Sequence, residues 1–210
     1  MNDGACKMFT PVIEIPAEIP RSIVLEPPLS DDEFEKLCAS CDFGSLERTK
    51  EGKIRMNAPA GGSTSSGNAE ITRQLSNWWI RARQGRVFDS SAGFFLPDSS
   101  VLSPDAAYAT AGQLEGLSRE KLARFLRLAP AFVVELLSPS DSLVQTGTKM
   151  EAWMANGVQL GWLIDPYTKT VHIYEPGAAA PRIETGPQVA GSGPVAGFVL
   201  DLEEIWRCYE

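Results

Sequence analysis

One stretch in the second half of the chain, residues 132–141, constrains the fold more than any other. It reads Phe-Val-Val-Glu-Leu-Leu-Ser-Pro-Ser-Asp, an apolar run that ends in a turn signal. This pattern is typical of a buried strand that is followed by a turn into a helix. Glu135 lies inside the apolar run, and a buried carboxylate without a partner would cost several kcal/mol or lose its charge. The sequence therefore predicts that a metal ion, a lysine or an arginine lies beside Glu135.

Length and charge limit the classes of protein to consider. The 210 residues suffice for one domain with appendages, and the net charge of −8 argues against nucleic-acid binding over the whole surface. A local basic groove is still compatible with this charge. No apolar run approaches the ~20 residues of a membrane span, and the N-terminus lacks the regions of a signal peptide. We therefore expect a cytoplasmic protein without a membrane partner.

Cysteine and histidine usage argues against two common kinds of site. Cys38 and Cys41 have the spacing of a metal-binding or redox pair, but no second cysteine pair and no nearby histidine completes a zinc site. We expect free thiols in a reducing compartment. The one histidine, His172, alternates with apolar residues in a predicted strand, so we give it no catalytic role. A single histidine also weakens any Ser/His/Asp hydrolase interpretation.

The order of predicted elements indicates an α+β (α/β-like) fold. Residues 1–28 are proline-rich and predict an extended arm, whereas residues 29–210 predict a single domain with a mixed central β-sheet flanked by helices. Helices are expected at 31–41, where Ser30 and Glu33 form a capping box, at 68–84, which Gly85 ends, at 118–128 and from 140 or 141 to 156. Strands are expected at 45–48 and 53–57, joined as a hairpin, and at 132–137, 160–165 and 171–174, with a flexible loop at 61–67. The helical crossover between the strand of Glu135 and the strand at Leu160 is long enough to make that pair parallel.

Three further residues join Glu135 as candidates for chemistry. Asp105 follows a proline at the start of a strand, Lys149 lies about two turns into the helix after Glu135, and Glu70 lies early in a long helix. Each alone has an ordinary explanation as a turn residue, a solvated residue or a helix-dipole partner. Together, two carboxylates and a backbone carbonyl are what a Mg²⁺ ion prefers, and a nearby lysine can stabilise developing negative charge. The set therefore indicates metal-assisted phosphodiester hydrolysis.

The most basic stretch of the chain lies at the end of the long helix and contains Arg81, Arg83 and Arg86. Cations there can interact with the helix macrodipole, or they can contact phosphates. The sequence leaves both interpretations open.

The ordered motifs resemble the Uma-type restriction endonuclease family of the PD-(D/E)XK nuclease superfamily. They are Ser-Pro-Asp105, Val-Val-Glu135-Leu-Leu-Ser-Pro-Ser-Asp, and Lys149 ahead of Asn156-Gly157-Val158 and Gly161-Trp162-Leu163-Ile164-Asp165. The resemblance extends from about Phe34 to Trp206. It implies a restriction-endonuclease-like core, a Mg²⁺ or Mn²⁺ ion bound by Asp105, Glu135 and the backbone of Leu136, and a catalytic set that Lys149 and Glu70 complete. The superfamily usually carries its lysine where this chain has Leu137, so the implied lysine lies on the next helix.

The function that we expect is a metal-dependent endonuclease that hydrolyses DNA, with a homodimer supplying one active site for each strand. A catalytically inactive nucleic-acid-binding or regulatory protein of the same fold is the first alternative. The second is a structural or interaction domain in which Glu135 pairs with Lys149 or an arginine. The sequence does not decide between DNA and RNA.

Overall fold

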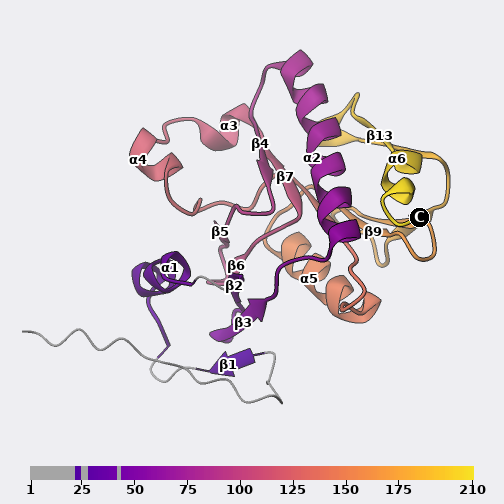
Figure 1. Cartoon of the computed structure of the whole chain (residues 1–210). Coiled ribbons are helices and arrows are strands. Elements are labelled where there is room, and N and C mark those ends of the chain that lie inside the picture. The colour runs from indigo at the N-terminus through magenta and orange to yellow at the C-terminus, as the bar shows by residue number, and fades with distance from the viewer. Residues whose placement is uncertain (1–21, 25–27, 42–43) are drawn as a thin grey trace, which may run out of the picture.

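The computed structural model describes residues 22–24, 28–41 and 44–210, and Figure 1 shows how they are arranged. The centre of the described part is a six-stranded mixed sheet. In spatial order its strands are β11 (Arg182–Glu184), β10 (Thr170–Tyr174), β9 (Leu160–Asp165), β8 (Phe132–Leu136), β7 (Ala106–Ala109) and β4 (Arg86–Asp89). β8 and β9 run parallel, which confirms the prediction from the helical crossover. The other neighbouring strands pair antiparallel.

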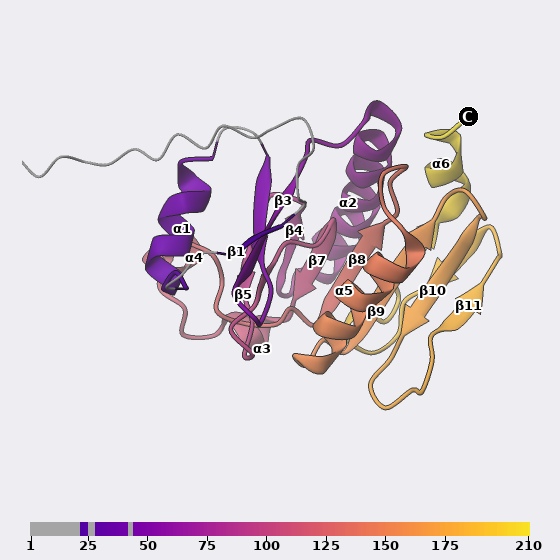
Figure 2. The same ribbon diagram turned by 90° about the horizontal axis from the view of Figure 1, so that it is seen from below.

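Two helices, α2 (Gly62–Ala82) and α5 (Leu143–Ala155), cover opposite faces of this sheet (Figure 2). Successive side chains of a strand point to opposite faces. Along β8, Phe132 and Val134 accordingly pack in the cluster that contains the apolar side chains of α2, whereas Val133 packs in the cluster that contains those of α5. Glu135 follows Val134, so its carboxylate faces α5.

A second sheet, antiparallel and five-stranded, lies beside the first. Its spatial order is β1 (Ser22–Val24), β3 (Lys53–Asn57), β2 (Ser45–Arg48), β6 (Val101–Leu102) and β5 (Phe94–Phe95). The predicted hairpin is confirmed, since β2 pairs with β3. The helix α1 (Asp31–Ala39) begins with the predicted capping box at Ser30 and Glu33, and its Phe34 packs into a small core on this sheet.

The remaining described elements are short. They are α3 (Ala111–Leu114), α4 (Arg119–Leu122), β12 (Gln188–Ala190), the 3₁₀ helix η1 (Gly193–Val195), β13 (Val199–Asp201) and α6 (Leu202–Arg207). β12 and β13 form a two-stranded ribbon, and α6 packs beside α2. In the described part of the chain, no helix combines the length and apolar character that crossing a membrane requires.

The long helix α2 begins six residues before the predicted start at Asn68, at Gly62. The glycine- and serine-rich stretch 61–67, predicted to be a flexible loop, is therefore largely helical. Thr64 and Gly67 are buried in this first part of the helix, and a Cβ on Gly67 would lie 2.7 Å from Leu136 Cδ2. Tertiary packing thus outweighs the low helix propensity of glycine and serine. The helix ends at Ala82, and Arg83 takes the left-handed conformation two residues before the predicted stop at Gly85, which also has a positive φ.

Two other predictions need correction or lie outside the described residues. The helix predicted at 118–128 is only α4, because the chain then extends so that Leu126 pairs with Phe94 and the Phe125 N–H donates to Glu35. Most of the predicted N-terminal arm, residues 1–28, lies outside the described residues. Its residues 22–24 form β1, which pairs with β3.

Candidate active site

Glu135 lies on β8, and only 4% of the residue is exposed. The Trp153 Nε1–H donates a hydrogen bond to Oε1 at 2.8 Å, and the Nζ of Lys149 lies 3.0 Å from each carboxylate oxygen. Burial raises the pKa of Glu135 to about 8, with Lys149 opposing the shift and the charges of Asp105 and Glu47 adding to it. The partner that the sequence required for Glu135 is thus present as a lysine and an indole, both on α5.

The turn after β8 directs α5 toward Glu135. The Leu137 N–H still donates to the Ile164 carbonyl, and the carboxylate of Asp141 then accepts hydrogen bonds from the Ser138 N–H and hydroxyl. Asp141 is occupied in this way, so the helix is capped by Ser142 and not by the predicted Ser140 or Asp141. Lys149, two turns into α5, reaches back to Glu135 on the strand.

The ammonium of Lys149 has one protein acceptor for each of its N–H donors. It lies 2.7 Å from the carbonyl oxygen of Ser103, 2.8 Å from Oε1 of Glu47 and 3.0 Å from Glu135. Burial alone would lower the pKa of Lys149, but the negative charges of Glu135, Glu47 and Asp105 outweigh it and raise the pKa. Lys149 therefore keeps its positive charge over the whole physiological pH range.

Asp105 is fixed by two hydrogen bonds just before β7. Its Oδ2 accepts from the Leu136 backbone N–H at 2.7 Å, and its Oδ1 accepts from the Asn68 side-chain amide at 2.8 Å. The Asp105 N–H donates to the Val134 carbonyl, which sets the two acids on neighbouring strands. Burial raises the pKa of Asp105, although Lys149 and these hydrogen bonds lower it. Asp105, Glu135 and Lys149 thus form one electrostatic cluster, as predicted.

Two members of this cluster were not identified from the sequence. Glu47, on β2, is 4% exposed and pairs with Lys149. An acidic residue in a short hairpin strand is normally expected to face solvent, so the sequence did not single it out. Asn68, on α2, donates to Asp105, but the helix was predicted to begin only at Asn68. The one sequence signal for Glu47 was that two charged residues, Glu47 and Arg48, are adjacent in a short strand. Adjacent strand residues point to opposite faces, so one of the two charges must face the protein interior.

Comparison with known proteins identifies a family for the chain. A family model, Uma2, described as "Putative restriction endonuclease", matches residues 31–203. The chain belongs to the Uma2 family. This match confirms the resemblance drawn from the motifs around Asp105, Glu135 and Lys149. No curated protein matches the chain.

A solved structure supports the fold of this Uma2 chain. It is the crystal structure of "a putative nuclease belonging to DUF820" from Anabaena variabilis ATCC 29413. The two are 22% identical, the likeness covers 87% of this chain and 100% of that one, and the TM-score is 0.72. The predicted fold class, a mixed central sheet flanked by helices with a restriction-endonuclease-like core, is confirmed.

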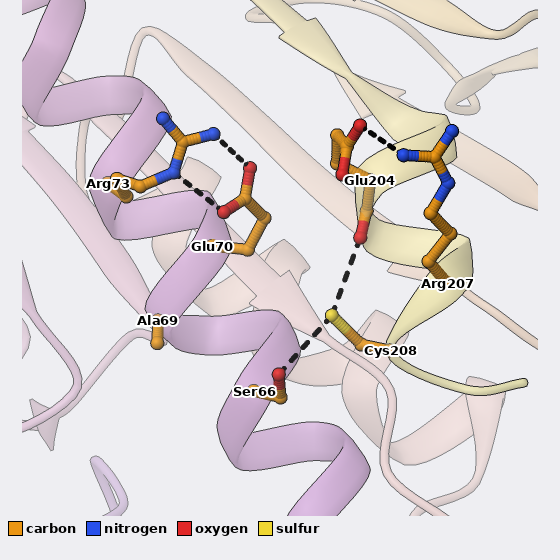
Figure 3. Close-up of a pocket in the computed structure, with 7 residues that line it drawn as sticks. All are labelled: Ser66, Ala69, Glu70, Arg73, Glu204, Arg207 and Cys208. Atoms are coloured by element: carbon orange, nitrogen blue, oxygen red, sulfur yellow. Dashed lines mark hydrogen bonds and ion pairs between the residues drawn. The ribbon is translucent and has the colours of Figure 1, made fainter.

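Glu70, the fourth predicted catalytic residue, has a different environment in this Uma2 chain. It lines a pocket of about 390 Å³ between α2 and α6 (Figure 3). Its carboxylate accepts two hydrogen bonds from Arg73 and one from Gln74, and in the described part of the chain no hydrogen bond joins it to Asp105, Glu135 or Lys149. The hydrogen bond from Arg73 is the main cause that lowers the pKa of Glu70, against the effect of burial.

The predicted nucleic-acid contacts Arg81, Arg83 and Arg86 lie at the far end of α2 and in β4. All three residues are exposed, and among the described residues none of them forms an ion pair. Arg81 lies about 20 Å along the helix axis from Asn68, at 1.5 Å per residue. The structure therefore does not bring these arginines into the cluster.

The cluster fits a divalent cation in charge and in donor chemistry. The carboxylates of Asp105, Glu135 and Glu47 oppose the single ammonium of Lys149, so two negative charges remain when all are ionised. Among the described residues, no group of three or more His, Cys, Asp and Glu side chains is arranged to hold a metal ion. Mg²⁺ is usually bound through one or two carboxylates and keeps several waters. Asp105, Glu135 and the backbone of Leu136 are the residues that would hold it.

Proposed function

We propose that this protein is a divalent-metal-dependent nuclease that hydrolyses phosphodiester bonds of DNA. The observation that carries the proposal is the buried cluster in which Asp105, Glu135 and Glu47 surround the single ammonium of Lys149, so that two negative charges remain when all four groups are ionised. A bound Mg²⁺ or Mn²⁺ would lower the pKa of a coordinated water and stabilise charge on a phosphoryl oxygen. Asp105 and Glu135 would hold the ion, and Lys149 would contribute a fixed positive charge beside the phosphate.

The test is cleavage of plasmid DNA by the purified protein with Mg²⁺ or Mn²⁺ and with a chelator. We expect cleavage that depends on the metal and that falls by at least about 100-fold in Asp105→Asn and in Glu135→Gln. Glu115→Gln is the matched control, because Glu115 is exposed. Undiminished cleavage in both site variants would show that the activity does not arise from this cluster.

Glu70 remains a predicted catalytic residue, and Glu70→Gln tests it in the same assay. A loss comparable with that of Glu135→Gln would support a role in the chemistry. Activity within a few-fold of wild type would mean that Glu70 has a structural role, through its hydrogen bonds with Arg73 and Gln74.

A catalytically inactive nucleic-acid-binding protein is the second candidate function. One observation favours it: all three N–H donors of Lys149 are already satisfied by the protein, as in a structural ion pair. Under this candidate, titration calorimetry would detect metal binding, but no nucleic acid would be cleaved. Turnover that Asp105→Asn abolishes would exclude it.

The assembly and domain limits are part of the proposal. We infer that residues 29–210 form the nuclease domain, that residues 1–28 form an appended arm, and that the protein acts as a homodimer, because cutting both strands of a duplex calls for two active sites. Sedimentation equilibrium measures the oligomeric state. A monomer that makes only single-strand nicks would contradict the dimer.

A further inference from the structure

Glu47 reaches the active-site cluster from the second sheet, and its contacts with that cluster are short. Its Oε1 lies 2.8 Å from the Nζ of Lys149 and accepts a hydrogen bond from the Ser103 N–H at 2.9 Å. The side chains of both members of the ion pair are well buried, at 6% exposure for Glu47 and 16% for Lys149. An ion pair of this kind is far less screened by solvent than a surface pair.

We propose that Glu47 is a positioning residue that fixes the ammonium of Lys149 at the edge of the catalytic cluster. The proposal rests on the proposed nuclease function, since it assigns Glu47 a role toward a residue of that site. Glu47 does not touch the reacting atoms in this role. It acts through Lys149.

The need for such a residue follows from the chemistry of lysine. Its ammonium sits on a flexible four-carbon stem, and its three donors can rotate. Glu135 alone would hold Lys149 at one point. Glu47 and the Ser103 carbonyl supply a second and a third, so that every donor has a fixed acceptor. The position of the charge is then determined from three directions.

Ser103 links this arrangement to the other acid of the cluster. Its N–H donates to Glu47, and its carbonyl accepts from Lys149. Glu47, Lys149 and the Ser103 peptide therefore form a closed set of contacts. Ser103 precedes Asp105 by two residues, so the same contacts tie the lysine to the segment that leads into Asp105.

The next residue, Arg48, anchors the strand from which Glu47 projects. Its guanidinium lies 5.2 Å from the ring centre of Phe34 and 5.8 Å from that of Phe95. It also donates to the Asp31 carboxylate and to the Leu29 and Ser99 carbonyls. Adjacent residues of a strand point to opposite faces, so this anchor holds β2 from one side while Glu47 faces the cluster on the other.

A double-mutant cycle tests the proposal against a merely structural role. Glu47→Gln keeps the size of the side chain and removes its charge. We expect kcat for DNA cleavage to fall by about 10-fold to 100-fold, as for residues that orient a catalytic group, with KM nearly unchanged. In a Lys149→Met background the same substitution should cause no further loss, because it acts through the lysine. Glu115→Gln should behave as wild type.

Two results would overturn the proposal: losses from Glu47→Gln and Lys149→Met that multiply in the double variant, or a kcat for Glu47→Gln within about twofold of wild type. If Glu47→Gln fails to fold, Glu47→Asp is taken through the same cycle with the same two criteria. Glu47→Asp retains the charge but shortens the side chain, so we expect a smaller loss of kcat than for Glu47→Gln.

A second readout needs no nuclease activity, so it separates this proposal from the proposed function. The Nζ–H protons of Lys149 should be protected from exchange with water by their three acceptors, and NMR detects them as a lysine signal that Lys149→Met removes. Glu47→Gln should speed their exchange by at least about 10-fold. Unchanged exchange would overturn the positioning role. Wild-type protein that shows this protection yet cleaves no DNA would refute the nuclease and leave the positioning intact.

Discussion

Asp105 and Asn68 are joined by a hydrogen bond that uses the amide nitrogen of Asn68 but not its amide oxygen. Asn68 Nδ2 donates to Asp105, while Asn68 Oδ1 is buried and has no hydrogen-bond partner among the described residues. In Asp105→Asn the new amide could donate to Oδ1 of a flipped Asn68 and still accept from the Leu136 N–H. The substitution also removes a buried charge whose pKa is raised by burial. We therefore expect the metal-free protein to gain about 1 kcal/mol in unfolding free energy, a typical stability–function trade-off, measured by urea denaturation with a chelator.

The control is the same substitution at Asp98. Its carboxylate accepts from the backbone and hydroxyl of Ser100, and hydrogen bonds outweigh burial and lower its pKa. Asp98→Asn should therefore destabilise the protein by about 1 kcal/mol. If Asp105→Asn were destabilising as well, burial of the Asp105 carboxylate would not reduce the stability of the metal-free protein.

The raised pKa of Glu135 gives a pH dependence whose sign is defined. The folded pKa of about 8 exceeds the ordinary value of 4.5, so its stabilising contribution is complete below about 4.5 and is lost as pH rises toward 8. The metal-free wild type should lose more unfolding free energy between pH 5 and pH 8 than Glu135→Gln does, by an amount on the order of a few kcal/mol. Chemical denaturation at the two pH values measures this difference. Parallel pH profiles for the two proteins would contradict it.

For single residues, the sequence predicted those whose type is unusual for the segment in which they lie. Glu135 was found because a charge interrupts an apolar run, and Lys149 because the next helix begins beside it. Asp105 needed the combined pattern. Glu47 and Asn68 were missed because each is ordinary within its own element, and only tertiary contacts with Lys149 and Asp105 distinguish them.

Gly67 sets how closely α2 approaches β8. A Cβ at this position would lie 2.7 Å from Leu136 Cδ2 and 3.4 Å from the Tyr209 ring. The helix-propensity gain of about 1 kcal/mol from Gly67→Ala should therefore be exceeded by an overpacking cost of about 1–3 kcal/mol. We expect a net loss of unfolding free energy, together with weaker Mn²⁺ binding in calorimetry, because the Leu136 N–H holds Asp105.

Gly62→Ala is the matched control in the same helix. Among the described residues, and apart from its chain neighbours and its own helix backbone, no atom lies within 4 Å of the position that its Cβ would take. The substitution should therefore be neutral or stabilising by less than about 1 kcal/mol. Equal effects of the two substitutions on stability would mean that the close packing at Gly67 does not determine where α2 lies.

Elements with a strong local signal were predicted closely, and those decided by packing were not. The capping box at Ser30 and Glu33 and the β2–β3 hairpin are determined by residues within the elements themselves. The first part of α2 does not, since glycine and serine favour loops until Leu136 and Tyr209 pack against them.

The cluster of Asp105, Glu135, Lys149 and Glu47 draws on both sheets of the molecule, which the order of elements alone could not predict. Asp105 and Glu135 belong to the central sheet, and their adjacency follows from the antiparallel pairing of β7 with β8. Glu47 comes from the second sheet, so the relative placement of the two sheets completes the site. A placement of this kind depends on the packing of Arg48 and Phe34 rather than on any periodic pattern.

The length of α2 leads to a prediction about how the whole molecule binds a substrate. Arg81 lies about 20 Å along the helix from Asn68, roughly the axial length of six base pairs. A duplex that enters the cluster and follows α2 would bring its backbone to the exposed Arg81 and Arg83. Arg81→Ala with Arg83→Ala should therefore weaken binding of a duplex of about 20 base pairs, measured without divalent metal, and reduce the salt dependence of log K by about one to two.

The control removes the same charge elsewhere, by Arg119→Ala with Lys121→Ala on α4, which lies apart from α2 in both views of the molecule (Figures 1 and 2). This pair should change affinity and salt slope much less. With DNA at saturating concentration, the Arg81 and Arg83 variant should keep its kcat, because these arginines lie outside the cluster. Equal loss of affinity in the two double variants would show that only net charge affects binding. The proposal that the duplex follows α2 would then be wrong.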